Sequence, residues 1–486
     1  MTASWLRGGR IVDGSGEAAW AGDILLAQGR IVAMGAALSD AQLAPWRSAG
    51  VEEIDCSGMV VAPGFIDVHT HDDAAAMDAP DMLPKLSQGV TTVIVGNCGI
   101  SLAPVVTDTP KAPLSLLGKR QFRHASMAAY AQAVDAAQPA VNVAALIGHT
   151  ALRMRHMAEL DRAATPAERQ AMAEEVAAAM EAGALGLSSG VFYKEAYAAD
   201  LDELVALATA AARHGGVYAT HIRDELAQIL PALQEAAQTA RQAGLPLVLS
   251  HHKCAGAANW GRTRETLGLI DALGQLQPIS LDVYPYTAGS TVLRSDLVDG
   301  VIDILITGSQ PHPEMVGRYL KDIAREWSLS EREACERLQP GGACYFQMCE
   351  ADVERVIAHP QSMIGSDGLP HDERPHPRLW GAFPRVLACY WREKGVLGLE
   401  EAVHKMTGLS ASRFRLAERG LLREGFHADV LVFDPERVRD LASYESPLQF
   451  SQGIERVWVN GQLSYTAQGR ATGARAGRFV RRMASH

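Results

Sequence analysis

The chain lacks the features that would place it in a membrane or on a nucleic acid. It has no apolar run of about 18 residues, and its start, Met1-Thr-Ala-Ser-Trp-Leu-Arg, has no signal-peptide pattern, so we expect a cytoplasmic protein. It also has no basic stretch and no interleaving of aromatic and basic residues, and its formal net charge is −11. These absences argue against a membrane and against nucleic acid as partners.

The cysteine pattern argues against a disulfide framework. The seven cysteines are odd in number, are scattered along the chain and form no CxxC motif, which is typical of reduced thiols. What the chain does have is length and apolar content: 486 residues, 48% of them hydrophobic. It can therefore bury a large core and is too long for one small domain.

The middle of the chain alternates between strand-like and helical segments. Most of the strand-like runs are separated by alanine-rich stretches, and some of these begin at a capping sequence such as Thr165-Pro-Ala-Glu168 or Asp200-Leu-Asp-Glu203. Repeated strand–helix alternation predicts an α/β protein built on a (β/α)8 barrel. The eight predicted strands are Gly64–His69, Thr91–Asn97, Val141–Gly148, Ala184–Ser188, Val217–His221, Pro246–His251, Ile279–Tyr284 and Ser362–Asp367.

Short strands and turns fill both ends of the chain. Residues 24–34 contain two apolar runs about a Gln-Gly turn, which indicates a hairpin, and 428–434 and 456–461 have the same style. We expect the two ends, 1–61 and 416–486, to form one small sandwich-like β-domain beside a barrel at 62–415. The last two barrel strands are separated by a long connection, which predicts a lid-like insert at about 290–345.

Residues of metal-binding type end the predicted barrel strands. The first run ends in His69 and His71, and their i, i+2 spacing places both side chains on one face of a strand. Because the carboxyl ends of barrel strands meet at one mouth, we expect a zinc site there. Later runs end in the same kind of side chain: Cys98, His149, His221, His251 and Asp367.

Each of these residues also has a simpler interpretation. Cys98 can be a small buried apolar residue, and His221 can be a hydrogen-bonded histidine of the core. Asp367 can cap a turn, or it can shuttle protons beside a metal-activated water. His252 should point away from His251, so we expect it, like His149, to be structural.

Seven segments carry a family resemblance: 62–71, 89–99, 183–190, 220–223, 250–253, 284–290 and 365–368. With them the chain resembles the amidohydrolase superfamily and, within it, the N-acyl-D-amino acid deacylases (D-aminoacylases). The Val-His-Thr-His motif marks only the superfamily, whereas the Asn-Cys-Gly, Ser-His-His-Lys and Tyr-Pro-Tyr-Thr motifs are far narrower. The resemblance covers nearly the whole chain, the insert included.

The resemblance implies a zinc enzyme with one tight metal site and a weaker second one. In the family the tight zinc is held by residues that match Cys98, His221 and His251. The weaker site uses residues that match His69, His71 and Asp367.

The end of predicted strand 4 distinguishes this family from other amidohydrolases. Many two-metal members, such as the hydantoinases, bridge their metals there with a modified lysine. Here the strand ends Gly186-Leu-Ser-Ser-Gly190, and Lys194 comes later. We expect the Cys98 thiolate to replace the bridging lysine.

The resemblance also implies the reaction, the hydrolysis of an N-acyl-D-amino acid to a carboxylate and a free D-amino acid. Asp367 would take a proton from the attacking water and pass it to the leaving amine. The family binds the substrate α-carboxylate with residues that match Tyr193, Lys253 and Arg378, and we expect Tyr284 to line the same site. Each cation has a simpler reading as a solvated surface side chain.

Arg294 indicates which substrate side chain the site prefers. It follows the segment at 284–290, and a cation there favours a second substrate carboxylate over an apolar side chain. We therefore expect N-acyl-D-glutamate as the first substrate and N-acyl-D-aspartate as the second. The alternative is that Arg294 pairs with Asp296 or Asp299 and never meets the substrate, which would suit a deacylase for apolar D-amino acids.

Two further functions are alternatives. One is a cyclic-amide hydrolase of the hydantoinase type, which the missing lysine in strand 4 disfavours. The other is a non-catalytic metal-binding scaffold. Such proteins tend to lose ligands or the shuttle carboxylate, whereas this chain keeps every one of them.

Overall fold

The computed structural model describes residues 3–47, 50–118 and 120–482. At its centre two parallel sheets, of strand order β6-β7-β8 and β9-β10-β11-β12-β13-β17, join at both edges. Only Leu146 separates β8 from β9, and a parallel bridge between Thr70 and Gly368 connects the ends of β6 and β17. The two sheets therefore close into a barrel of eight parallel strand positions, as the alternation predicts.

The barrel strands are short and buried. In β7 every residue of the Val-Thr-Thr-Val-Ile-Val run is buried, as expected for a parallel strand covered on both faces. The strands are β6 (Phe65–Asp67), β7 (Val90–Val95), β8 (Asn142–Ala145), β9 (Ile147–Gly148), β10 (Gly186–Gly190), β11 (Val217–His221), β12 (Leu247–Leu249), β13 (Ile279–Val283) and β17 (Ser362–Ile364).

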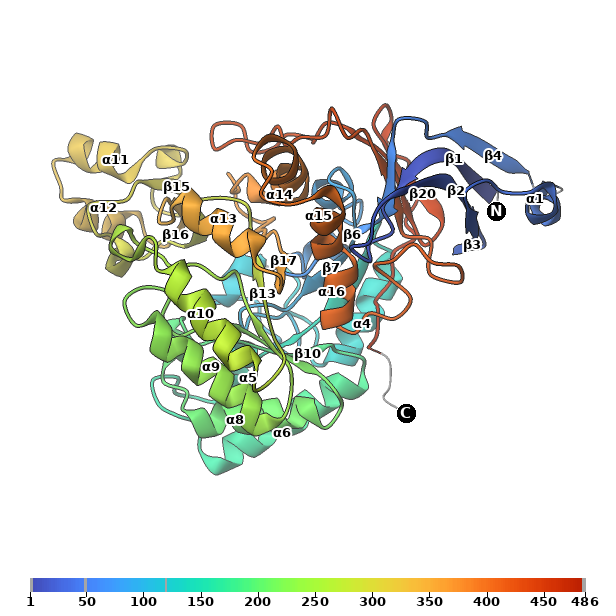
Figure 1. Ribbon diagram of the computed structural model, residues 1–486. Helices are drawn as coiled ribbons and strands as arrows, with labels where there is room; N and C mark the ends of the chain where they lie inside the picture. The colour runs from blue at the N-terminus through green and yellow to red at the C-terminus, as the bar shows by residue number, and fades with distance from the viewer. Residues whose placement is uncertain (1–2, 48–49, 119, 483–486) are drawn as a thin grey trace.

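Helices surround the barrel (Figure 1). Thr165 and Glu168 form the predicted capping box at the start of α6. Asp200 caps α8, but the Glu203 side chain does not return to it and instead binds His149 and Arg153. The longer barrel helices are α4 (Met127–Ala137), α5 (His149–His156), α6 (Pro166–Glu181), α8 (Leu201–Ala212), α9 (Ile229–Ala243), α10 (Thr263–Gly274), α13 (Glu350–Ala358), α14 (Arg378–Arg385) and α15 (Leu399–Met406).

One sheet combines strands from both ends of the chain. Its path is β21-β20-β19-β18-β5-β1-β2-β3, with β4 also paired to β1, and β5 joins the two ends because it pairs with both β1 and β18. The division into segments at 61 and 415 stays a prediction, and residue 61 lies inside β5. The strands are β1 (Ala3–Ile11), β2 (Trp20–Ala27), β3 (Arg30–Gly35), β4 (Val51–Asp55), β5 (Val60–Pro63), β18 (Val430–Phe433), β19 (Ile454–Val459), β20 (Gln462–Thr466) and β21 (Arg470–Ala471).

The long connection between β13 and β17 forms a separate lobe at the left of Figure 1. Three antiparallel strands, in the order β14-β16-β15, pack with two helices around a small apolar core of their own. The lobe contributes Ser290, Thr291 and Tyr345 to the cavity at the barrel mouth. Its elements are β14 (Gly289–Val292), β15 (Ile304–Ser309), α11 (Leu320–Trp327), α12 (Glu331–Leu338) and β16 (Gly341–Tyr345).

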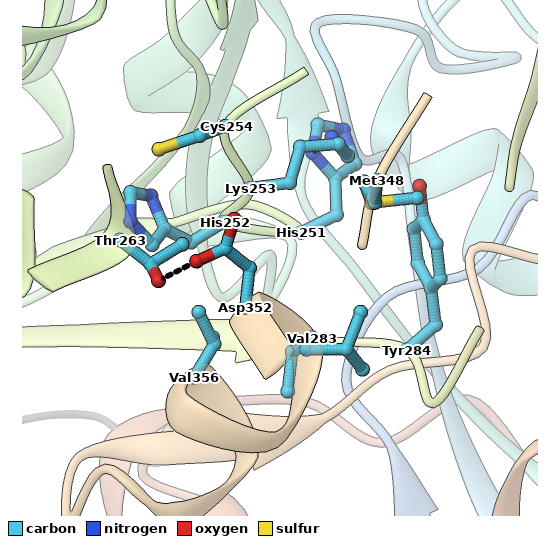
Figure 2. Close-up of a pocket in the computed structure, with 11 residues that line it drawn as sticks. His251, His252, Lys253, Cys254, Thr263, Val283, Tyr284, Met348, Asp352 and Val356 are labelled. Atoms are coloured by element: carbon cyan, nitrogen blue, oxygen red, sulfur yellow. Dashed lines mark hydrogen bonds between the residues drawn. The ribbon is translucent and has the colours of Figure 1, made fainter. Parts of the chain in front are cut away.

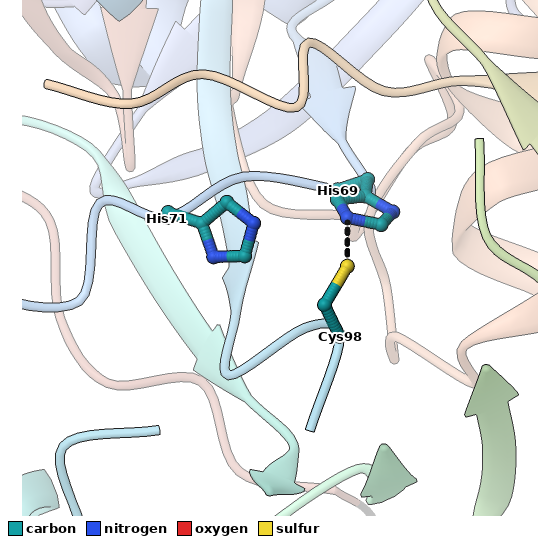
Figure 3. A group of neighbouring side chains, drawn as sticks. All are labelled: His69, His71 and Cys98. Atoms are coloured by element: carbon teal, nitrogen blue, oxygen red, sulfur yellow. Dashed lines mark hydrogen bonds between the residues drawn. The ribbon is translucent and has the colours of Figure 1, made fainter. Parts of the chain in front are cut away.

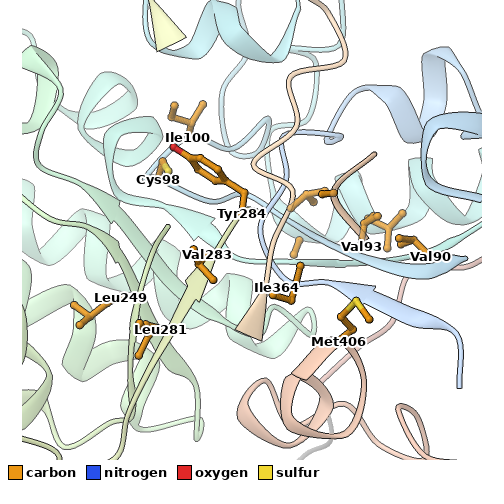
Figure 4. Packing of buried hydrophobic residues seen from close by; sticks show 14 of the residues in the cluster. Val90, Val93, Cys98, Ile100, Leu249, Leu281, Val283, Tyr284, Ile364 and Met406 are labelled. Atoms are coloured by element: carbon orange, nitrogen blue, oxygen red, sulfur yellow. The ribbon is translucent and has the colours of Figure 1, made fainter. Parts of the chain in front are cut away.

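The main hydrophobic core reaches the barrel mouth. Figure 4 shows a part of it, from Val90 and Val93 on β7 to Leu281 and Val283 on β13, and Cys98 and Tyr284 belong to the same cluster. The site is therefore built on packed strands rather than on free loops. Among the described residues, none of the helices combines the length and hydrophobicity needed to cross a membrane.

Candidate active site

Two histidine groups meet at the thiol of Cys98. Its Sγ lies 3.2 Å from Nε2 of His69 and 3.4 Å from Nε2 of His251. In each of two buried groups, His69–His71–Cys98 and Cys98–His221–His251, one possible ligand atom per residue lies within 4.8 Å of the others. Figure 3 shows the first group, with Cys98 facing His69. Cys98 is thus shared by two candidate metal positions.

The barrel explains why residues so distant in sequence come together. His69 and His71 follow β6, Cys98 follows β7, His221 ends β11 and His251 lies just after β12. Cys98, His251 and Asp367 have positive φ angles of 54°, 35° and 49°. Non-glycine residues rarely adopt this conformation, and it tends to persist at functional sites, where the surrounding structure holds it.

The chemistry of the group suits a thiophilic divalent metal. Burial alone would raise the pKa of the Cys98 thiol, but His69 and His251 hold it well below its usual range, which favours the thiolate form that binds metals. Both ring nitrogens of His221 and Nδ1 of His71 are buried without a hydrogen-bond partner in the described part of the chain. Buried nitrogens without partners are costly, and a metal ion would satisfy one nitrogen on each ring.

Asp367 lies beside this cluster, on the loop after β17. Its Oδ1 is 3.3 Å from Nε2 of His71 and 3.6 Å from Nε2 of His69, and its Oδ2 is 2.9 Å from Nη1 of Arg378. Burial would raise the pKa of Asp367, but Arg378 and the neighbouring histidines, His71 first, hold it well below its usual range. The carboxylate is therefore ionised.

Buried partners that no motif revealed support these residues. Asp282, at the end of β13, lies 3.2 Å from Nδ1 of His69 and accepts the backbone N–H of His251 at 2.9 Å. A carboxylate behind a histidine orients the ring toward a metal. The sequence could have singled out Asp282, because it lies near the end of a predicted strand, as Cys98 and His221 do.

Lys85 ties together the two loops that carry His69, His71 and Asp367. Its buried ammonium donates to Asp67 at 2.8 Å, to Ser366 at 2.9 Å and to Thr70 at 3.0 Å. It also lies 3.0 Å from Asp72. A buried lysine needs such anionic partners, and only the folded chain brings them to it.

The inner cavity at the mouth contains three of the five predicted substrate-binding residues. Tyr193, Lys253 and Tyr284 line it, together with Asp367 and Glu225. Lys253 donates to Glu225 at 2.6 Å. No sequence motif singled out Glu225, which lies four residues after His221.

The two predicted arginines lie outside the lining of this inner cavity. Arg378 is fully buried, forms an ion pair with Asp367 and donates a hydrogen bond to the carbonyl oxygen of Ser290 at 3.1 Å. Arg294 lines the wider outer groove instead and forms a bidentate pair with Asp296, at 3.0 and 2.5 Å. The ion pair between Arg294 and Asp296, which was the alternative interpretation of the sequence, is therefore present.

The residues expected to be structural lie outside both groups of candidate ligands. His252 points away from the cluster into a small cavity behind it (Figure 2) and hydrogen-bonds Thr266 at 2.8 Å. Burial lowers the pKa of His252 to about 3, so its ring is neutral. His149 is fully buried and lies 2.7 Å from Glu203. Lys194 is exposed in the short helix after β10.

The comparison with known proteins identifies relatives along the full chain. A model of an amidohydrolase family matches residues 52–326 and 334–465. Three curated relatives come from Alcaligenes xylosoxydans xylosoxydans. A D-aminoacylase is 48% identical over 99% of this chain and 98% of its own, and an N-acyl-D-aspartate deacylase is 47% identical over 96% and 93%. An N-acyl-D-glutamate deacylase is 44% identical over 99% and 96%.

A solved structure agrees with these relatives. The N-acyl-D-glutamate deacylase of Bordetella bronchiseptica, complexed with zinc and a phosphonate mimic of the tetrahedral intermediate, matches with a TM-score of 0.93 and 44% identity. The match covers 98% of this chain and 99% of that one. Because relatives named for different D-amino acids match almost equally well, identity alone does not distinguish the substrate side chain.

Proposed function

Because the chain belongs to the amidohydrolase family, and within it to the D-aminoacylases, we propose that it hydrolyses N-acyl-D-amino acids to a carboxylate and a free D-amino acid. The observation that carries this proposal is the sulfur of Cys98, which two histidine groups share, with Asp367 beside them. That arrangement combines a metal site with a proton acceptor at the edge of a cavity.

The residues present fit zinc, which prefers thiolate and imidazole ligands. Cys98, His221 and His251 would hold the tight ion, and His69, His71 and Asp367 a weaker second one. Zinc bound there supplies a Lewis acid that polarises the acyl carbonyl and lowers the pKa of water. The absence of a lysine at the end of β10 disfavours the cyclic-amide alternative.

The protein's own groups perform the proton transfers. Asp367 accepts a proton from the attacking water through its ionised carboxylate and then donates that proton to the amine nitrogen of the leaving group. Lys253 offers a point charge to the substrate α-carboxylate, while Tyr193 and Tyr284 form the adjoining walls of the cavity. Arg378 lies outside the lining of the cavity and is paired with Asp367, so from this position it would attract the same carboxylate only through its charge.

Arg294 supports a preference for acidic side chains, glutamate first and aspartate second. Its guanidinium lies 4.5 Å from the ring centre of Phe192, a residue that lines both the inner cavity and the outer groove. Its present partner, Asp296, is 56% exposed, and exposed ion pairs contribute only about 0–1 kcal/mol. A substrate carboxylate can therefore displace Asp296.

Variants of this ion pair test the preference. Arg294→Gln should lower kcat/KM for N-acetyl-D-glutamate about tenfold, the equivalent of one charge-assisted hydrogen bond, and leave N-acetyl-D-leucine unchanged. Asp296→Asn should raise kcat/KM for the glutamate substrate, because the arginine loses its competitor. Steady-state kinetics of both variants on both substrates measure this, and equal effects on the two substrates would refute the role of Arg294.

A substrate panel tests the activity itself. Zinc-loaded protein is assayed for amine release from N-acetyl-D-glutamate, N-acetyl-D-aspartate, N-acetyl-D-leucine and N-acetyl-L-glutamate. We expect turnover of the D substrates, fastest for glutamate, and none of the L form. If N-acetyl-D-leucine is turned over fastest, the deacylase activity stands and the preference for acidic side chains is refuted. No turnover of any of them would refute the proposed function.

A further inference from the structure

Glu225 contacts three residues of the site at once. Its Oε1 lies 2.6 Å from Nζ of Lys253 and 3.1 Å from Nδ1 of His251, and its Oε2 lies 3.6 Å from Nε2 of His221. The residue is 6% exposed. Its backbone carbonyl also accepts the N–H of Ala255 at 2.7 Å, which joins the loop after β11 to the loop after β12. Glu225 is therefore held in place from both loops.

Nδ1 of His251 has two neighbours of opposite hydrogen-bonding type, an acceptor and a donor. This nitrogen lies 3.1 Å from the Glu225 carboxylate and 2.8 Å from the Lys253 ammonium. A carboxylate only accepts hydrogen bonds and an ammonium only donates them. If Nδ1 carries the hydrogen it donates to Glu225, and if it does not it accepts from Lys253. The neutral ring cannot satisfy both neighbours.

Only one of the two tautomers suits a metal. The opposite ring nitrogen, Nε2, faces the thiolate of Cys98 at 3.4 Å. When Nδ1 donates to Glu225, Nε2 has a free lone pair to offer to an ion. When Nδ1 accepts from Lys253, Nε2 carries the hydrogen and cannot bind one.

We propose that Glu225 is a positioning residue that selects the metal-binding tautomer of His251 by offering Nδ1 an acceptor at 3.1 Å, while the same oxygen also binds the Lys253 ammonium at 2.6 Å. The carboxylate accepts from both groups through one oxygen, so the ammonium is directed to Glu225 and its remaining hydrogens stay available in the cavity. The inference rests on the proposed function in that the selected nitrogen serves the proposed zinc.

Zinc affinity tests this inference without any assay of activity. The apoprotein of each variant is titrated with zinc in competition with a chromogenic chelator. Glu225→Gln should bind zinc about 10- to 100-fold more weakly, the usual loss when the partner of a metal-binding histidine is removed. Lys253→Met should keep the wild-type zinc affinity, because Glu225 alone selects the tautomer.

A matched control separates positioning from general stability. Glu235 also binds a cation, Arg223 at 2.7 Å, but it lies on α9 and contacts none of the candidate ligands. Glu235→Gln should leave zinc affinity unchanged. Thermal unfolding of each apoprotein checks folding, and Glu225→Asp, which keeps the charge but shortens its reach, provides a second variant with an expected intermediate affinity.

The outcomes are distinct from those of the proposed function. Wild-type zinc affinity in Glu225→Gln would overturn the inference, as would an equal loss in Glu225→Gln and Glu235→Gln. If the wild-type protein binds zinc but hydrolyses no N-acyl-D-amino acid, the proposed function fails while the zinc titrations still decide the role of Glu225.

Discussion

Replacing Asp367 with asparagine is expected to lower kcat by about 10³-fold, within the range of about 10²- to 10⁴-fold for the loss of an acid–base group. The amide nearly matches the carboxylate in size but cannot take a proton from water or return it to the leaving amine. The zinc held by Cys98, His221 and His251 should remain. Steady-state kinetics and metal analysis of the purified variant measure both effects.

The ion pair with Arg378 makes a folding control necessary. Arg378 is 1% exposed and Asp367 12%, and breaking a buried pair from one side costs about 3 kcal/mol. Thermal unfolding should show this loss, and the double variant Asp367→Asn, Arg378→Met should recover stability without recovering turnover. Asp372→Asn, on the same loop, should keep kcat. A kcat within tenfold of wild type in folded Asp367→Asn would show that Asp367 is not the acid–base group.

Replacing Cys98 with serine should lower turnover as strongly, because the variant binds the metal poorly. Cys98 is the one residue common to both candidate groups of ligands in the described chain, and its thiolate provides their anionic donor. A serine hydroxyl stays protonated at neutral pH and is a poor zinc ligand. We expect the variant to bind zinc more than about 100-fold more weakly, beyond the loss typical of a residue that only supports a ligand.

A second buried cysteine provides the control for this prediction. Cys254 is also buried, and its Sγ lies 3.9 Å from Thr266, outside both groups of ligands. Burial raises the pKa of its thiol to about 11, so it is neutral. Cys254→Ser should keep wild-type zinc content and turnover. Stoichiometric, tightly bound zinc in Cys98→Ser would contradict the shared-thiolate site.

Local patterns were sufficient to predict much of the site. The i, i+2 spacing of His69 and His71 and the polar residue at the end of each apolar run are properties of adjacent residues, and a barrel brings strand ends together whatever the details of packing. The structural roles expected for His252 and His149 stay predictions, and the structure places a hydrogen-bond partner beside each of them, Thr266 for His252 and Glu203 for His149.

The environment of the cations could not be predicted this way. Arg294 and Arg378 lie in suggestive segments, yet the structure pairs the first with Asp296 and the second with Asp367. Whether a cation binds the substrate or a neighbouring carboxylate depends on which of them the folded chain places within ion-pair distance. The sequence offered both possibilities for Arg294 and no means to choose between them.

The alternation of strands and helices and the chemical identity of the residues at the strand ends can be read from the sequence, because hydrophobic period and motif spacing are local. The buried partners that support these residues appear only in the folded chain. Asp282 meets His69 across 213 residues and Lys85 meets Ser366 across 281. Such pairs form because a buried charge or imidazole must find its partner wherever closure of the barrel places one.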